Sequence, residues 1–221
     1  MLRAHGSFLP FDTIIGRKII MAFNVNDKPK MPEQDAPEEG IYPARLVRII
    51  EEGDQEDKYG VKSRVVFAFT VPSLTMELDG EKKQRMFMTF PLNKTSNPDS
   101  TVAKYVKALG GATWEDIIGK PCMIEISHRT KDGITRANIT NVVKPMNGME
   151  VAAPDCDVYI FDYDAPNKEV FDKLSEYRQD RIKNAVNYNG SKVQQMLEGT
   201  TPQQYAQDAV ADSIMDDDIP F

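Results

Sequence analysis

Cysteine and histidine are scarce in this sequence, with two of each in 221 residues. Cys122 and Cys156 lie far apart in the sequence and do not suggest a disulfide framework, so a reducing cytoplasm is the simpler setting. Together with His5 and His128 they form no paired spacing of the kind that structural zinc sites use. We therefore expect no metal and no other cofactor.

Long apolar runs and enzyme motifs are also missing. No apolar run approaches the length of a bilayer-spanning helix, so we expect no membrane partner. The chain contains no P-loop, no GxSxG and no HExxH motif, and we expect no enzyme. The acidic loop expected over 51–60 offers Glu51, Glu52, Asp54, Glu56 and Asp57 as carboxylates for a magnesium-dependent nuclease. Acids clustered on one loop are more often a solvated surface, which is the interpretation we favour.

Basic residues are absent from one end of the chain. The segment 198–221 has no Lys or Arg but holds six of the 34 acidic residues. Residues 1–197 contain the other 28 acidic residues and all 27 basic residues. This body therefore carries a net charge of −1, although the whole chain carries −7. A near-neutral body can still present a local basic groove. The acidic segment itself has little core-forming material and is expected to be a flexible tail.

What the sequence does contain is a regular alternation of apolar and polar residues. This pattern predicts strands over 41–50, 62–71, 85–90, 122–127 and 136–143. The period changes to helical over 101–109, with Ser100 or Asp99 as the N-cap and Gly110 with Gly111 as the stop signal. A hairpin turn is predicted at 131–133.

Five strands with a helix between the third and the fourth predict a mainly β fold over 40–150. That order is typical of the OB-fold, a five-stranded Greek-key barrel, and a generic five-stranded α+β domain is the alternative. A leader and linker are expected over 1–39, and a small α-helical extension over 151–197. In that extension the pattern predicts a helix over 167–186 and a short helix capped by Ser191. An acidic tail over 198–221 completes the predicted domain organisation.

Basic residues interleave with aromatic residues on the predicted strands and hairpins. Binding of single strands needs cations along the phosphates and flat rings on which bases stack. In OB-folds the face of strands 2 and 3 and two of the hairpin loops bind oligonucleotides. The candidates for DNA binding on these elements are Tyr59, Lys62, Arg64, Lys83, Arg85, Phe87, Arg129, Lys131 and Arg136.

The aromatic residues differ in what their strand neighbours imply. Phe67 and Phe69 share a face with valines and are expected in the core. Phe87 shares its face with Arg85 and Thr89, which makes it the better candidate for stacking. Trp114 is expected to pack a helix, and every single lysine or arginine can equally be an ordinary surface residue.

The last six residues combine dense charge with an apolar ending. They are Asp216, Asp217, Asp218, Ile219, Pro220 and Phe221. Pro220 restricts its own backbone and favours extended geometry at Ile219. The hexapeptide resembles the C-terminal tip of bacterial and phage single-stranded DNA-binding proteins, and the body resembles that family only in its expected strand order.

The resemblance implies a function for this tip. In the family the tip docks on replication, recombination and repair enzymes, whose pockets combine an apolar floor with a basic rim. By similarity Phe221 would be the anchor, Ile219 and Pro220 secondary contacts, and Asp216–Asp218 the electrostatic partners. Capture of a C-terminal carboxylate is a known recognition mode. The extension over 151–197 has no counterpart in the bacterial family, so the chain looks more like a phage-encoded relative, acting in the host cytoplasm.

The sequence thus predicts a non-enzymatic protein that coats single-stranded DNA without sequence preference and recruits partner enzymes through its tip. Self-association into a homo-oligomer is compatible with this function. The alternative is a replication or recombination adaptor whose barrel binds protein or duplex DNA.

Overall fold

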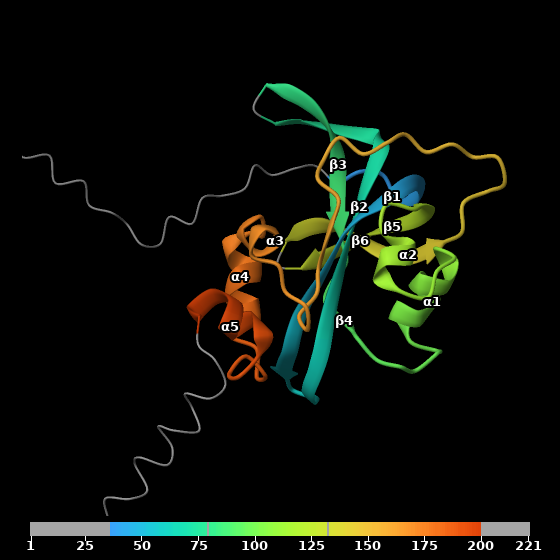
Figure 1. Ribbon diagram of the computed structural model, residues 1–221. Helices are drawn as coiled ribbons and strands as arrows, with labels where there is room; N and C mark the ends of the chain where they lie inside the picture. Colours follow the sequence, from blue (N-terminus) through green and yellow to red (C-terminus); the bar gives the residue numbers. More distant parts are fainter. Residues whose placement is uncertain (1–35, 79, 132, 200–221) are drawn as a thin grey trace, which may run out of the picture. The chain divides into compact units, whose positions relative to one another are not determined.

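Antiparallel strands dominate the computed structural model, which describes residues 36–78, 80–131 and 133–199 (Figure 1). The sheet runs in the order β3-β2-β1-β5-β6, with β4 paired to β2 and β7 paired in parallel to β1. The strands are β1 Gly40–Asp57, β2 Gly60–Leu78, β3 Glu81–Met88, β4 Leu92–Asn93, β5 Pro121–Lys131, β6 Ile134–Val143 and β7 Tyr159–Phe161. The prediction of a mainly β chain is confirmed.

Five short helices accompany the sheet in the described part of the chain. They are α1 Thr101–Ala108, α2 Trp114–Ile117, α3 Lys168–Asp172, α4 Glu176–Lys183 and α5 Lys192–Glu198. Ser100 caps α1 by accepting a hydrogen bond from the Ala103 N–H, as its position predicts. Ser191 caps α5 in the same way, through the Gln194 N–H. None of these helices reaches the length and apolar character that crossing a bilayer requires.

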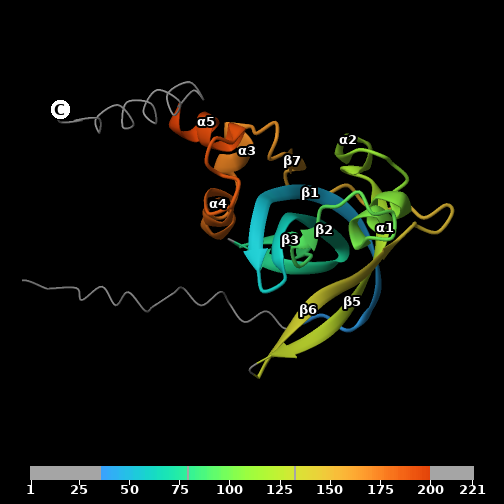
Figure 2. The same cartoon turned by 90° about the horizontal axis from the view of Figure 1, so that it is seen from below.

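The first two strands are longer than the sequence pattern predicts. The expected acidic loop over 51–60 is wrong: β1 continues to Asp57 and pairs with β2 down to Gly60. A register shift between Glu51 and Gly53 marks a bulge, and Gly53 has φ 71°. A Cβ on Gly53 would lie 2.5 Å from the Tyr163 ring, so only glycine fits here. Bulges bend strands, and the sheet is strongly curled (Figure 2).

The inner face of the curled sheet holds the main core. Phe67 and Phe69 are fully buried there, as the alternation predicts. The helix α1 adds Val102 and Tyr105 to this core, and the Tyr105 ring meets the Phe67 ring at a centroid distance of 6.1 Å. Because side chains alternate along a strand, one face of β2 supplies all of these contacts.

The segment after β6 forms a second apolar cluster on the same sheet. Ile50 of β1 packs with Phe161, Phe171 and Ile182 of the extension. The predicted single helix over 167–186 is wrong, because the chain forms α3 and α4 with a break between them. The Gln179 Nε2 donates to the carbonyl oxygens of Phe171 and Leu174 and so satisfies the end of α3.

Candidate nucleic-acid interface

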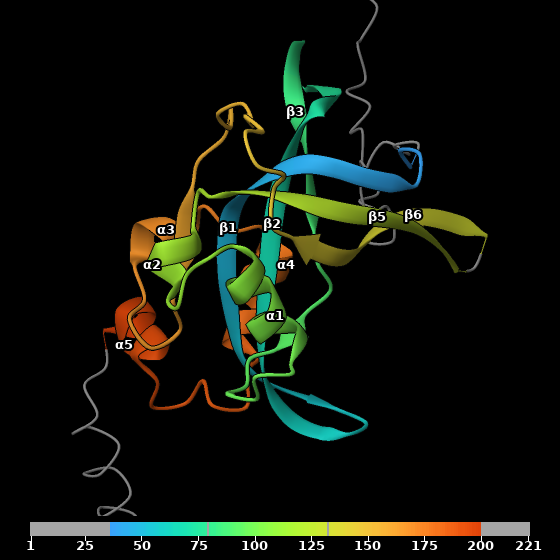
Figure 3. The same ribbon diagram turned by 90° about the vertical axis from the view of Figure 1, so that its right-hand side faces the viewer.

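The hairpin formed by β5 and β6 projects from the rest of the sheet (Figure 3) and carries three of the predicted cations, Arg129, Lys131 and Arg136. Arg129 and Arg136 are cross-strand partners, and Lys131 stands opposite Ile134. Partners in an antiparallel pair point to the same face, and residues two apart share that face. The three cations predicted from the sequence therefore lie together.

These cations line a hollow with a volume of about 430 Å³, which we name the hairpin hollow. Its lining consists of Phe90, Arg129, Lys131, Ile134, Arg136, Ala137 and Asn138. Among the residues that the structure describes, no carboxylate lines it. Like charges directly opposite each other on a sheet are destabilising, so a bound anion would relieve the Arg129–Arg136 repulsion.

Phe90 is the aromatic residue of this hollow, and sequence reasoning missed it. It lies two residues after the end of β3, is 52 % exposed, and its ring centroid lies 5.4 Å from the Arg129 Cζ. The sequence pattern places Phe90 on one strand face with Met86 and Met88. The available signal is Pro91, because proline cannot continue strand pairing and a large apolar residue before it is left without a strand partner.

The turn between β1 and β2 presents a second exposed ring. Tyr59 is 71 % exposed, with the Lys58 Nζ 4.7 Å and the Lys62 Nζ 5.2 Å from its ring centroid. The structure thus brings the predicted pair Tyr59 and Lys62 together and adds Lys58. A ring flanked by two ammonium groups can stack on a base while the lysines meet its phosphates.

Two of the predicted DNA-binding residues, Arg64 and Phe87, make contacts within the fold and are not exposed on the surface. Arg64 pairs with the Asp57 carboxylate and donates to the Asn93 Oδ1, and its side chain is only 16 % exposed. Phe87 is buried in the core at 8 % exposure, so its assignment as an exposed stacking residue is corrected. Phe87 is the cross-strand partner of the buried Phe69, so both rings lie on the face of the sheet that the main core covers.

The remaining predicted cations lie on β3. The Lys83 Nζ pairs with the Glu81 carboxylate at 2.6 Å, and the Arg85 Cζ lies 5.2 Å from the Phe87 centroid. Beside them the Gln84 N–H donates to the Asp155 carboxylate, and the Gln84 Nε2 donates to the Ala153 carbonyl. A segment between β6 and β7 therefore crosses this strand, which the sequence did not indicate.

Two of the five acids expected on a solvated loop, Glu51 and Glu52, are buried instead. Glu52 is fully buried and accepts from Arg178 and from Arg181, the latter at 2.9 Å. Glu51 is 2 % exposed and accepts from the Trp114 Nε1 at 2.7 Å. Burial of a carboxylate requires such partners, since an unpaired buried charge is costly.

One group of carboxylates approaches the geometry of a cation site. Oxygen atoms of Glu51, Asp162 and Asp164 lie within 4.8 Å of one another. The Lys94 Nζ lies among them, 2.7 Å from Glu51 and 3.9 Å from Asp164. The lysine already supplies the positive charge at this point, and we assign no metal to it.

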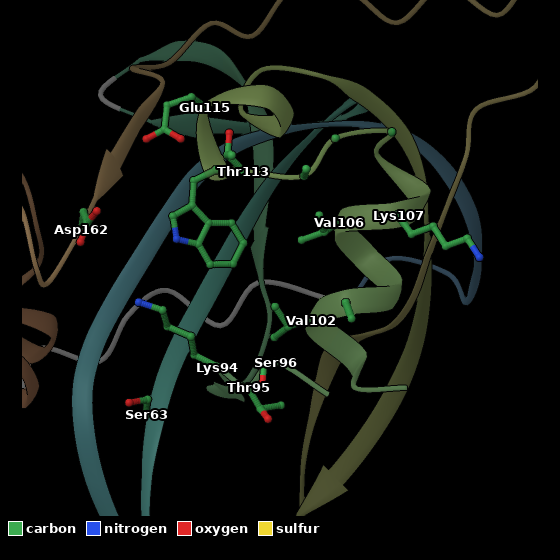
Figure 4. Close-up of a pocket in the computed structure, with 15 residues that line it drawn as sticks. Ser63, Lys94, Thr95, Ser96, Val102, Val106, Lys107, Thr113, Glu115 and Asp162 are labelled. Atoms are coloured by element: carbon green, nitrogen blue, oxygen red, sulfur yellow. The ribbon is translucent and has the colours of Figure 1, made fainter. Parts of the chain in front are cut away.

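A second and larger hollow of about 980 Å³ lies beside Trp114, and we name it the Trp114 hollow (Figure 4). It is bounded by α1, by α2 with the turn before it, and by the segment 94–96 after β4. The indole lies across from Val102 and Val106 (Figure 4). The expected packing role of Trp114 is confirmed by its edge-to-face contact with Phe67 at 5.7 Å, and one side of the ring also lines the hollow.

The two thiols are poor nucleophiles in this structure. Burial raises the pKa of Cys122 to about 12, although Arg45 opposes the shift. Burial also raises the pKa of Cys156. Both side chains are protonated at neutral pH, because the thiolate forms only near or above the pKa.

The chain matches no protein-family model, and no curated protein matches it. The interpretation of its function therefore rests on its own residues. Of the predicted residues, the tip Asp216–Phe221 and the leader 1–35 lie outside the described part of the chain.

Proposed function

We propose that this protein binds single-stranded DNA without strong sequence preference and has no enzymatic activity. The observation that carries the proposal is the hairpin hollow, where three cations and an exposed phenylalanine surround one concave surface. Cations that track phosphates, combined with rings that accept stacked bases, are what sequence-tolerant binding of single strands requires. Tyr59 with its two lysines extends the same chemistry to the neighbouring hairpin.

The fold that we propose for this function is the OB-fold. The strand order β3-β2-β1-β5-β6, with α1 and α2 between the third and the fourth long strand, supports it. Nucleic acid would then contact hairpin loops at β1–β2 and β5–β6, which is where Tyr59 and the hairpin hollow lie.

The tip Asp216–Phe221 supplies the second half of the proposed function. Its resemblance to the tip of bacterial and phage single-stranded DNA-binding proteins supports recruitment of replication, recombination and repair enzymes in a bacterial cytoplasm, and a phage origin for the chain. Deletion of Asp216–Phe221 is expected to abolish capture of such enzymes while DNA binding persists. Equal capture with and without the hexapeptide would contradict this half.

Fluorescence anisotropy with labelled oligo(dT) across a salt series tests the DNA-binding half. Each phosphate contact to a single strand contributes about −0.7 to the slope of log K against log salt, so the three hairpin cations predict a slope of about −2. Unlabelled oligo(dT) should displace the probe much better than a duplex of equal length. A duplex that competes equally well would favour the adaptor alternative, and absence of oligo(dT) binding at low salt would refute the DNA-binding half of the proposal.

A further inference from the structure

The Trp114 hollow has a rigid aromatic wall. The Trp114 Nε1 is held at 2.7 Å by Glu51, and Glu51 in turn accepts from the Tyr163 N–H at 3.2 Å and pairs with Lys94. The indole is also restricted by the Phe67 ring, which meets it edge to face at a centroid distance of 5.7 Å. An aromatic ring fixed in this way loses little conformational freedom when a ligand stacks on it.

Besides the indole, polar and charged side chains that could contact a nucleotide line the Trp114 hollow. Thr95 and Ser96 supply hydroxyl groups, Lys94 lies beside the indole in its ion pair with Glu51, and Lys107 extends from α1 away from the indole (Figure 4). Glu115 and Asp162 also line the hollow and offer acceptors for N–H groups on a base edge. A large hollow with an aromatic wall and a few convergent polar groups is typical of ligand sites.

The two hollows are connected by one extended segment. Phe90 lines the hairpin hollow, and Lys94 lines the Trp114 hollow. The segment between them is held to β2, because Leu92 and Asn93 pair with Val65 and Arg64 and the Lys94 N–H donates to the Ser63 carbonyl. Four residues of extended chain span at most about 14 Å. A bound strand of a few nucleotides can cover that distance, since single-strand sites of OB-folds hold about 4 to 16 nucleotides.

We propose that the Trp114 hollow holds one nucleobase of the same single strand that occupies the hairpin hollow. The base stacks on the indole of Trp114, and Lys107, whose ammonium points away from the indole, contacts a phosphate where the strand leaves the hollow. This inference rests on the proposed function and assigns it a second contact point, near α1 and α2.

The single tryptophan of the chain makes the inference testable, because its emission reports on this hollow alone. The full-length protein is titrated with oligo(dT) of about 4 and about 16 nucleotides, while anisotropy of a labelled strand reports total binding. The longer strand is expected to quench Trp114 strongly and the shorter one, seated in the hairpin hollow, weakly.

Two charge reversals on α1 provide a matched pair. Lys107→Glu places a carboxylate in the lining of the hollow, whereas Lys104→Glu changes an exposed lysine of the same helix that does not line it. Lys107→Glu should abolish the length-dependent quench and weaken binding of the longer strand at least about fivefold, the lower end of one base stack. Lys104→Glu should leave the quench in place.

The outcomes separate this inference from the proposed function. Anisotropy that reports binding while Trp114 emission stays constant at both lengths would overturn the inference and leave the proposed function standing. Equal loss of quench in Lys104→Glu and Lys107→Glu would also overturn it, because general charge would then explain the effect. Absence of binding by anisotropy would overturn both.

Discussion

Two clusters of arginine in this protein face opposite electrostatic surroundings. In the hairpin hollow, Arg129 and Arg136 stand opposite each other, and no carboxylate is among the described residues that line the surface. Where the extension meets β1, Arg178 and Arg181 converge on the fully buried Glu52. The same residue type therefore lies beside another cation at one place and holds the fold together at the other.

The difference shows that a count of cations does not identify a nucleic-acid surface. Arg64 belongs with the second group, since Asp57 and Asn93 already bind its guanidinium. The aromatic residues divide in the same way: Phe90 is half exposed beside Arg129, whereas Phe87, three residues earlier, is in the core. Local pairing and burial decide which of these side chains remain available to the proposed DNA ligand.

The largest expected effect on stability comes from removing the buried Glu52, which pairs with Arg178 and Arg181. Glu52→Ala should lower the free energy of unfolding by about 3 kcal/mol, because it leaves two arginines without their buried partner. Urea unfolding measures this change. Glu56→Ala, an exposed acid on the same strand, is the control and should change stability by less than about 0.5 kcal/mol. Equal effects in the two variants would refute a bracing role for Glu52.

Removing the charge of the hairpin hollow should affect binding and spare the fold. Arg129→Ala combined with Arg136→Ala is expected to weaken oligo(dT) binding about 30-fold at low salt and to make the salt slope shallower by about 1.4, equivalent to two lost phosphate contacts. Arg64→Ala is the matched control and should lower stability with little change in the slope. A slope that is the same in the double variant and the wild type would remove these arginines from the interface.

The two phenylalanines sharpen the comparison further. Phe90→Ala should weaken oligo(dT) binding about tenfold through loss of one stacked base, with stability unchanged. Phe87→Ala should instead lower the free energy of unfolding by about 3 kcal/mol, since it opens a cavity in the core. Oligo(dT) titrations and urea unfolding curves of both variants measure these quantities. A loss of stability in Phe90→Ala, or a loss of binding without loss of stability in Phe87→Ala, would contradict these roles.

The smallest expected effect lies at the turn between β1 and β2. Tyr59→Ala should weaken binding only about threefold, less than a full base stack contributes, because a ring at a hairpin tip is held on few sides. Anisotropy at fixed salt measures it. An effect larger than that of Phe90→Ala would make this turn, and not the hairpin hollow, the centre of the interface.

Local sequence signals predicted much of the fold. The alternation around Phe67 predicted its core position, and Ser100 and Ser191 predicted the starts of α1 and α5, because both signals depend on residues a few positions apart. The hairpin cations Arg129, Lys131 and Arg136 were predicted for the same reason, since a tight turn brings both strands to one face. The tip Asp216–Phe221 remains a prediction from resemblance.

The errors of prediction arose where distant segments meet. The acids at Glu51 and Glu52 resembled a solvated loop because their partners, Arg178 and Arg181, lie on α4, far away in the chain. Phe87 had a polar local neighbourhood, yet its partner on the neighbouring strand is the buried Phe69. Phe90 was overlooked because its exposure depends on where β3 stops pairing.

By itself, the sequence determined the strands, the turns, the helix caps and the separation of the acidic segment 198–221 from a near-neutral body, because these follow from periodicity, backbone preference and charge along the chain. Only the tertiary structure decided which cations remain available to a ligand. Glu52 meets its arginines across 126 and 129 residues of chain. Contacts of that range leave no local pattern, since they depend on how the bulge at Gly53 bends β1 and on the docking of the extension along it.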